Sequence, residues 1–269
     1  MTFPDARERP AIALTIAGSD SGGGAGIQAD LRSFAAFGVH GLTAITAITA
    51  QNTCGVSAIQ MVSQRLVEAQ IKAVLDDFPV AAIKIGMIGT PGLCRTISRA
   101  LANHREIPLI VDPVLVATTG ASLARGKMVA AIRRNLIPLA DLLTPNLPEA
   151  EQLLDRRIES RDQLLDAAHE LRAAGASAVL LKGGHLPGTE VSDVLVTAHN
   201  VQWFSHPRID VEGHGTGCTL AAAIGAGMAT GSSLETAVAG AIDFVNRALQ
   251  LAYRPGRGSI VVLDHLAAS

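Results

Sequence analysis

The chain has 269 residues, of which 48% are hydrophobic and 17% are charged, and its formal net charge is -2. This composition predicts a substantial α/β core and excludes a broad basic face for nucleic acid. No apolar run reaches the roughly 18 residues of a membrane span, so no membrane association is expected. Three scattered cysteines and an N-terminus without an apolar signal segment predict a reduced, cytoplasmic protein.

Short apolar runs alternate with helical patterns along the first half of the chain. Ser63 is a candidate N-cap for a helix that ends near residue 78. A second predicted helix covers residues 25–37, where apolar residues recur with helical spacing. The remaining predictions are strands at residues 11–17, 42–50, 56–62, 81–85 and 109–112, and a helix at residues 93–102.

The second half continues the same alternation. Ser232 and Glu235 have the spacing of a capping box for the last helix. Predicted helices are residues 127–136, 148–154, 162–174, 217–229 and 234–251, and predicted strands are residues 141–143, 178–182, 191–197, 201–204 and 260–263. This order predicts a mostly parallel sheet with helices on both faces, in one domain over residues 11–269 after a flexible tail at residues 1–10.

Glycine-rich and polar clusters follow the predicted strands at their carboxyl ends. In an open α/β sheet these ends form the ligand-binding edge. The clusters are the glycine-rich loop of residues 18–26, Gln51-Asn52, Gly86-Met87, Asp112-Pro113, Thr144-Pro145-Asn146 and Gly183-Gly184-His185. The sequence therefore predicts a ligand site at this edge.

The segment HGTGCT, residues 214–219, opens a predicted helix with small residues. Backbone N–H groups of Gly215, Thr216 and Gly217 at a helix start can converge on an anion, which the helix dipole also favours. A glycine-rich turn needed for tight packing is the alternative. Cys218 in the same turn is either a thiolate favoured by the helix N-terminus or a small buried apolar side chain.

Three further polar residues are candidates for phosphate and metal binding. Asn146 and Glu149, three residues apart at a helix start, can arrange Mg²⁺ through its waters, although simple capping explains them equally well. Lys182 at the end of an apolar strand is well placed for a phosphate, or it is a surface side chain. Asp30 lies in the first turns of the helix at 25–37, where an acid also serves the dipole alone.

Seven motifs occur in the order found in the hydroxymethylpyrimidine/phosphomethylpyrimidine kinases, a ribokinase-like family that the chain resembles over nearly all of residues 11–265. They are TIAGSDSGGGAGIQADL, ITAQNT, KIGMIG, VDPVLVATTG, LLTPNLPEA, VLLKGGH and HGTGCTL. The resemblance implies a three-layer αβα domain, commonly a homodimer. It also implies ATP-dependent phosphorylation of 4-amino-5-hydroxymethyl-2-methylpyrimidine and then of its monophosphate.

The resemblance also implies residue roles. Asn146 and Glu149 would arrange Mg²⁺, and Lys182 would meet the ATP phosphates. The residues at 215–218 would form the anion hole, with Cys218 as general base, a role worth about 10²–10⁴-fold in rate. The implied pyrimidine contacts are Gln51, Asp30, Gly18, Thr49, Met87 and Val114. An amide such as Gln51 can offer the pyrimidine both a donor and an acceptor.

Three other functions compete with this interpretation. A pyridoxal kinase shares the implied fold and anion hole, although Cys218 argues against the standard type. A cysteine hydrolase using Cys218 and His214 lacks an orienting third residue, and the pair is close in sequence. A pyrimidine-binding module without catalysis would have no need of the phosphate motifs.

Overall fold

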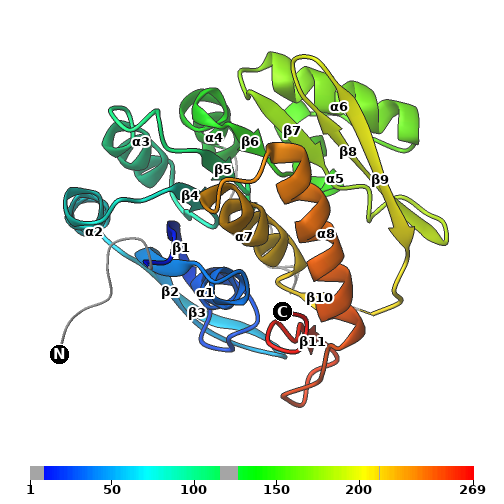
Figure 1. The fold of residues 1–269 in the computed structure, drawn as a ribbon, viewed down its shortest axis with the longest axis horizontal. Helices are drawn as coiled ribbons and strands as arrows, with labels where there is room; N and C mark the ends of the chain where they lie inside the picture. Colours follow the sequence, from blue (N-terminus) through cyan, green and yellow to red (C-terminus); the bar gives the residue numbers. More distant parts are fainter. Residues whose placement is uncertain (1–8, 116–126, 212) are drawn as a thin grey trace.

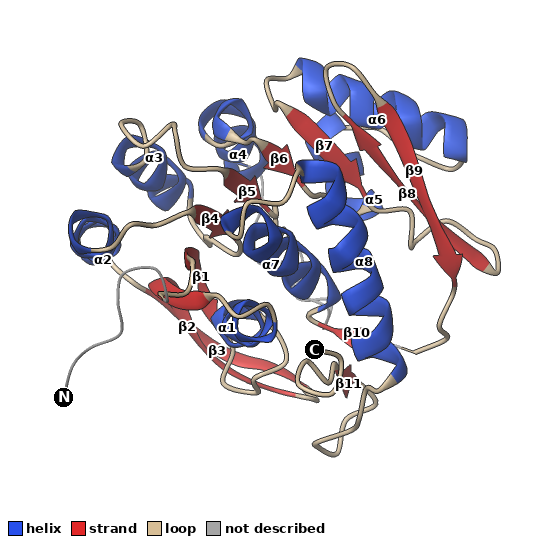
Figure 2. Ribbon diagram, in the orientation of Figure 1, coloured by secondary structure: helices blue, strands red, loops and turns tan. Residues whose placement is uncertain are grey.

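The computed structural model describes residues 9–115, 127–211 and 213–269. The predicted tail therefore lies outside the described residues, apart from residues 9 and 10. Within the described ranges, nine strands form one sheet in the order β3-β2-β1-β4-β5-β6-β7-β8-β9 (Figures 1 and 2). Their bounds are β1 Ile12–Ser19, β2 His40–Asn52, β3 Gly55–Met61, β4 Ala82–Ile85, β5 Leu109–Val111, β6 Leu142–Leu143, β7 Ala178–Leu181, β8 Glu190–Val196 and β9 Val201–Pro207.

The centre of the sheet is parallel, as the alternation of strands and helices predicts. Strands β2, β1, β4, β5, β6 and β7 pair in parallel, whereas β3, β8 and β9 are antiparallel to their neighbours. Strand β9 continues past the predicted end at residue 204, because it pairs with all of β8 as far as Glu190 opposite Pro207. The expected three-layer αβα fold is confirmed.

The helices divide between the two faces of the sheet (Figure 2). One layer contains α1 (Gly26–Ala36), α7 (Thr216–Ala229) and α8 (Leu234–Gln250), with α7 in contact with both others. The other contains α2 (Gln64–Asp77), α3 (Pro91–Ala100), α4 (Lys127–Asn135), α5 (Leu147–Leu154) and α6 (Arg161–Ala173). Each layer buries aliphatic side chains against its own face, which gives the domain two large apolar clusters.

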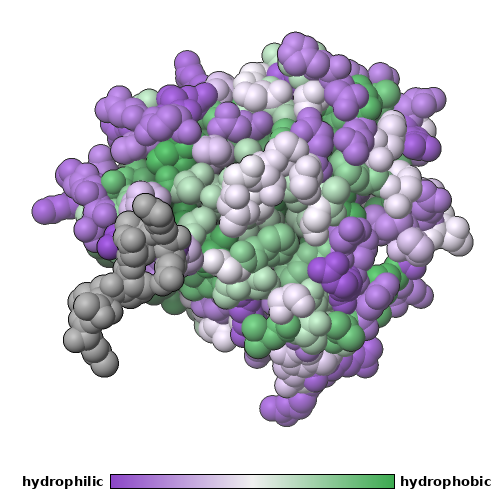
Figure 3. All heavy atoms as spheres, viewed as in Figure 1, coloured by the Kyte–Doolittle hydropathy of each residue, from purple (hydrophilic) through white to green (hydrophobic). Residues whose placement is uncertain are grey.

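Helix α7 is buried almost all round because its residues are small. Thr219–Gly227 is buried throughout, and the segment is rich in alanine and glycine. Figure 3 shows the face of the molecule on which α7 lies. Hydrophobic surface gathers near the centre of this face, over α7, and hydrophilic side chains dominate its rim. The first turn of α7 is thus held between α1, α8 and the sheet edge.

Local caps explain most helix starts. Ser63 accepts a hydrogen bond from the Leu66 N–H, as predicted. The predicted capping box of Ser232 and Glu235 is wrong, since Ser233 is the N-cap of α8 and accepts from the Thr236 N–H. Ser232 instead donates its backbone N–H to the Gly227 carbonyl and so closes the end of α7.

Two short elements escaped the sequence analysis. A two-residue strand, β10 (Gly213–His214), pairs in parallel with β11 (Val261–Val262), and a 3₁₀ helix, η2, covers Ile137–Leu139. Elements this short contain no more than one period of their hydrophobic pattern, so no repeat can be recognised. The β10–β11 pair matters because it holds the residues directly before α7. Among the described helices, none is long and apolar enough to cross a membrane.

Candidate active site

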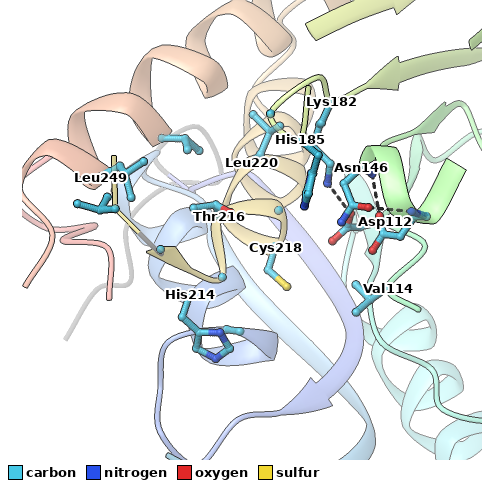
Figure 4. Close-up of a pocket in the computed structure, with 18 of the residues that line it drawn as sticks. Asp112, Val114, Asn146, Lys182, His185, His214, Thr216, Cys218, Leu220 and Leu249 are labelled. Atoms are coloured by element: carbon cyan, nitrogen blue, oxygen red, sulfur yellow. Dashed lines mark hydrogen bonds and ion pairs between the residues drawn. The ribbon is translucent and has the colours of Figure 1, made fainter. Parts of the chain in front are cut away.

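A cavity of about 670 Å³ opens at the carboxyl ends of the parallel strands, where the polar clusters were predicted to meet. It is lined by residues at the carboxyl ends of β1 and β2, by residues that follow β4, β5, β6 and β7, and by the first turn of α7 (Figure 4). All the candidate site residues predicted from the sequence except Asp30 are among the lining residues: Gly18, Thr49, Gln51, Met87, Val114, Asn146, Glu149, Lys182, Gly215, Thr216, Gly217 and Cys218.

The first turn of α7 has the geometry of an anion site. Gly215 is the N-cap and has φ 83°, in the left-handed region that favours glycine. A Cβ on Gly215 would overlap the Gly24 carbonyl oxygen, so the glycine-rich loop after β1 lies directly against this turn. Gly215 therefore serves close packing, which supports the alternative interpretation of the motif, and the anion site stays a prediction.

Lys182 brings a cation to the same turn. A Cβ on Gly217 would lie 3.0 Å from Lys182 Nζ and 3.8 Å from Asp112 Oδ2. Lys182 Nζ is 3.2 Å from Asp112 Oδ1, which also accepts a hydrogen bond from Thr144 Oγ1 at 3.2 Å. Burial disfavours the ammonium, but the carboxylates of Asp112 and Glu149 outweigh burial and raise the pKa of Lys182 above its ordinary value.

Asn146 and Glu149 form a reciprocal capping box at the start of α5. Asn146 N donates to Glu149 Oε2 at 2.8 Å, and Glu149 N donates to Asn146 Oδ1 at 2.9 Å. Both residues also line the cavity, so capping and ligand binding are compatible. Burial raises the pKa of Glu149 to about 7, despite the opposing effect of the Lys182 charge.

The carboxylates present fit a magnesium ion that keeps most of its waters. Among the described residues no group of three His, Cys, Asp or Glu side chains could hold a metal directly. Asp112 and Glu149 nevertheless both face the cavity beside Lys182. Mg²⁺ is commonly held by one or two carboxylates together with substrate phosphates, which suits this arrangement.

Cys218 points into the cavity from the first turn of α7 (Figure 4). Burial raises the pKa of the Cys218 thiol to about 11, and the nearby Lys84 ammonium only partly opposes this. The expectation of a thiolate favoured by the helix N-terminus is therefore wrong for the unliganded protein. Desolvation of the side chain outweighs the helix dipole.

We expect Cys218 to react slowly with iodoacetamide near neutral pH and faster as pH rises toward about 11, where the thiolate fraction increases. Cys54 is exposed and serves as the internal control. Mass spectrometry of tryptic peptides after brief exposure measures both rates. Alkylation of Cys218 as fast as that of Cys54 near neutral pH would show that its thiolate is accessible.

Asp30 does not line the cavity. Its carboxylate is fully buried between α1 and the sheet, 2.9 Å from Lys84 Nζ and 2.6 Å from Thr15 Oγ1. The interpretations as a pyrimidine contact and as a solvated acid of the first helical turn are both wrong. The sequence feature that indicates this ion pair is Lys84 in the apolar strand segment AIKI, because a buried lysine requires a charged partner.

Two acidic residues important to the site were not selected from sequence. Asp112 directly follows β5 and forms an ion pair with Lys182. The sequence placed Asp112 at the ligand-binding edge but gave it no role. Asp20 organises the glycine-rich loop by accepting the N–H groups of Gly22, Gly24 and Ala25. Burial raises the pKa of Asp20, but hydrogen bonds from His214 and these N–H groups outweigh it and leave the pKa below its ordinary value.

The cavity continues past Lys182 into a less polar region. Residues from the loop after β7, from the end of β9 and from α8 line it: His185, Val191, His206, Pro207, Ile209, Val211, Ile242, Val245, Asn246 and Leu249. Arg208 supports this region by donating to the carbonyls of Gly184, Leu186 and Gly188. The cavity therefore combines a polar region at the strand ends with a less polar region at α8.

Comparison with known proteins now places the chain. The family model for phosphomethylpyrimidine kinase matches residues 20–263. The chain belongs to the phosphomethylpyrimidine kinase family. It is 46% identical over 256 residues to a hydroxymethylpyrimidine/phosphomethylpyrimidine kinase of Rhizobium meliloti, covering 93% of this chain and 96% of the relative. A Streptomyces coelicolor protein of the same description is 41% identical, covering 98% of both chains.

Solved structures agree with this family assignment and with the resemblance inferred from the sequence motifs. A phosphomethylpyrimidine kinase from Clostridium difficile superposes with TM-score 0.80 at 39% identity, covering 88% of this chain and 99% of that chain. The ADP complex of Bacillus subtilis pyridoxal kinase superposes with TM-score 0.87 at 30% identity, covering 97% of this chain and all of that chain (100%). The phosphomethylpyrimidine kinase family thus shares its fold with pyridoxal kinases.

Proposed function

We propose that this chain phosphorylates 4-amino-5-hydroxymethyl-2-methylpyrimidine with ATP and then phosphorylates the monophosphate to the diphosphate. The observation that carries this proposal is one cavity whose lining includes Lys182, the α7 N-terminus, polar residues at the strand ends and side chains of α8. On one side are Gln51, Met87 and Val114, which offer an amide and apolar surfaces to a pyrimidine. Membership of the phosphomethylpyrimidine kinase family supports the same substrate class.

ATP occupies the other side of the cavity in this proposal. Its base and ribose contact the less polar region at α8 and β9, and its phosphates extend toward Lys182 and the N–H groups of Gly215–Gly217. In the first step the substrate hydroxyl oxygen forms a bond to the γ-phosphorus as the bond from this phosphorus to the ADP oxygen breaks, and the hydroxyl proton leaves to a phosphate oxygen or to solvent. In the second step an oxygen of the monophosphate attacks in the same way. The protein mainly positions these groups and neutralises charge, which suits phosphoryl transfer.

Magnesium would be held through its waters by Asn146 and Glu149, with Asp112 as a further carboxylate. When bound, the ion neutralises negative charge on the phosphates. Lys182 supplies a second positive charge from the protein itself. Cytoplasmic location and a homodimer remain predictions from the sequence and its resemblance, and the mass of the purified protein by light scattering tests the dimer.

Cys218 positions the substrate hydroxyl in this proposal and does not act as a strong base, because its thiol is neutral well above neutral pH. Cys218→Ser, which keeps a hydrogen-bonding group, is then expected to retain kcat within about threefold, and Cys218→Ala to lose about tenfold, with little change in the KM of the pyrimidine. Steady-state kinetics measure both variants. Losses of about 10²–10⁴-fold in both would instead assign Cys218 as general base.

The function is tested by ATP consumption with Mg²⁺, with hydroxymethylpyrimidine, its monophosphate and pyridoxal offered separately. Turnover of both pyrimidines with little turnover of pyridoxal is the expected result. Pyridoxal kinase is the second candidate, because the Bacillus subtilis pyridoxal kinase shares the fold with TM-score 0.87. Turnover of pyridoxal alone would select it, and turnover of none would leave a binding module.

A further inference from the structure

His214 stands at the junction of the glycine-rich loop and the pyrimidine side of the cavity. It belongs to β10, directly before the anion site, and its side chain lies near Cys218 in Figure 4. A single ring nitrogen, Nε2, faces two partners. It is 3.1 Å from Asp20 Oδ2 and 2.7 Å from the Nε2 position of the Gln51 carboxamide. Only 8% of the His214 surface is exposed.

His214 carries a proton on Nε2. Asp20 accepts three backbone N–H groups and is therefore a carboxylate, which needs a donor at the facing ring nitrogen. The other nitrogen, Nδ1, is buried without a partner among the described residues. A bare acceptor is tolerated there better than a buried N–H, because orphaned donors are the rarer case.

This tautomer decides which way the Gln51 carboxamide faces. Two N–H donors cannot meet at 2.7 Å, so the amide atom next to His214 Nε2 must be the oxygen. Amide oxygen and nitrogen have nearly the same shape, and hydrogen-bond partners decide their assignment. The Gln51 NH₂ group is then turned away from His214.

We propose that Asp20 and His214 act in series as positioning residues that make Gln51 a hydrogen-bond donor toward the substrate. The inference rests on the proposed function, in which Gln51 meets the pyrimidine. Because the Gln51 oxygen faces His214, the NH₂ group is the part of the amide left to face the substrate, and it donates to an acceptor, a ring nitrogen of the pyrimidine. Two N–H donors cannot pair, so this NH₂ group does not bind the exocyclic amine. This selects between the donor and acceptor roles that the sequence left open for Gln51.

The tautomer can be measured without any substrate. In protein labelled with ¹⁵N at histidine, long-range ¹H–¹⁵N spectra distinguish a protonated ring nitrogen from a bare one. His214 signals are identified as those lost in His214→Phe or, if that variant does not fold, in His214→Gln. A protonated Nε2 with a bare Nδ1 is expected. A protonated Nδ1 with a bare Nε2 overturns the proposal.

Ligand analogues test the consequence for specificity. Replacing the ring nitrogen that meets Gln51 by C–H should weaken binding about 10- to 100-fold, because it leaves the buried NH₂ donor unpaired. Two analogues, one for each ring nitrogen, are compared with the parent and with the analogue that lacks the exocyclic amine. Only one of the two ring analogues should bind more weakly than the parent. This loss should be smaller in His214→Phe, where the Gln51 amide is free to rotate. His199→Phe, an exposed histidine, is the matched control.

The outcomes separate this inference from the proposed function. Equal binding of both ring analogues, with a large loss for the analogue without the amine, overturns the donor role of Gln51. Failure of every pyrimidine to bind refutes the proposed function instead, and the histidine spectra then decide the Gln51 orientation by themselves.

Discussion

Lys182→Met is expected to lower kcat by about 10²–10³-fold, the range found when one charge-stabilising donor is removed from an active site. Lys182 Nζ lies against the first turn of α7 and beside Asp112, where the transferred phosphoryl group is proposed to pass. Without it, the carboxylates of Asp112 and Glu149 face the phosphates and have lost the ammonium beside them. We therefore expect a lower kcat and a higher KM for ATP.

Steady-state kinetics with varied ATP measure this effect, and circular dichroism confirms that the variant is folded. Lys72→Met is the matched control, since Lys72 is 73% exposed and pairs with Asp76 on the surface of α2. The control should keep kcat unchanged. A Lys182→Met enzyme within about threefold of the parent, far short of the loss expected for a charge-stabilising donor, would remove Lys182 from the proposed phosphate path.

Lys84→Met is expected to destabilise the fold by about 3–5 kcal/mol, because it leaves the buried Asp30 carboxylate without its partner. The two side chains are fully buried, and Lys84 Nζ is 2.9 Å from both carboxylate oxygens of Asp30. Burial alone would disfavour the ammonium, but Asp30 outweighs it and raises the pKa of Lys84 above its ordinary value. Burial also raises the pKa of the Asp30 carboxyl, and the Lys84 ammonium and the Thr15 hydroxyl only partly oppose this.

Urea unfolding monitored by circular dichroism measures the free energy of unfolding. The double variant Lys84→Met with Asp30→Leu should recover much of the loss, since an apolar pair of similar volume can replace a buried ion pair. Lys72→Met again supplies the control, because an exposed ion pair contributes about 0–1 kcal/mol. A single variant as stable as the parent would show that Asp30 finds another partner or is protonated.

The protein's sequence determines the layered architecture through local patterns that do not depend on distant contacts. Apolar runs of strand length alternate with helical spacing, and this order restricts the chain to a mainly parallel sheet covered on both faces. The same order places polar residues after β1, β2, β4, β5, β6 and β7 at one edge. For this reason the sequence alone predicts that Gln51, Asn146 and Lys182 lie at one site, and all three line the same cavity.

Other properties depend on residues far apart in the sequence, and only the tertiary structure decides them. Asp30 lies outside the site because its carboxylate is buried and pairs with the ammonium of Lys84, 54 positions away in the sequence. The pKa of the Cys218 thiol depends on how completely its surroundings exclude water, and a motif at a helix start does not show this. The role of His214 likewise requires Gln51, 163 positions away, and Asp20, 194 positions away. Sequence patterns encode local geometry and burial, whereas desolvation and hydrogen-bond pairing arise only when the chain is folded.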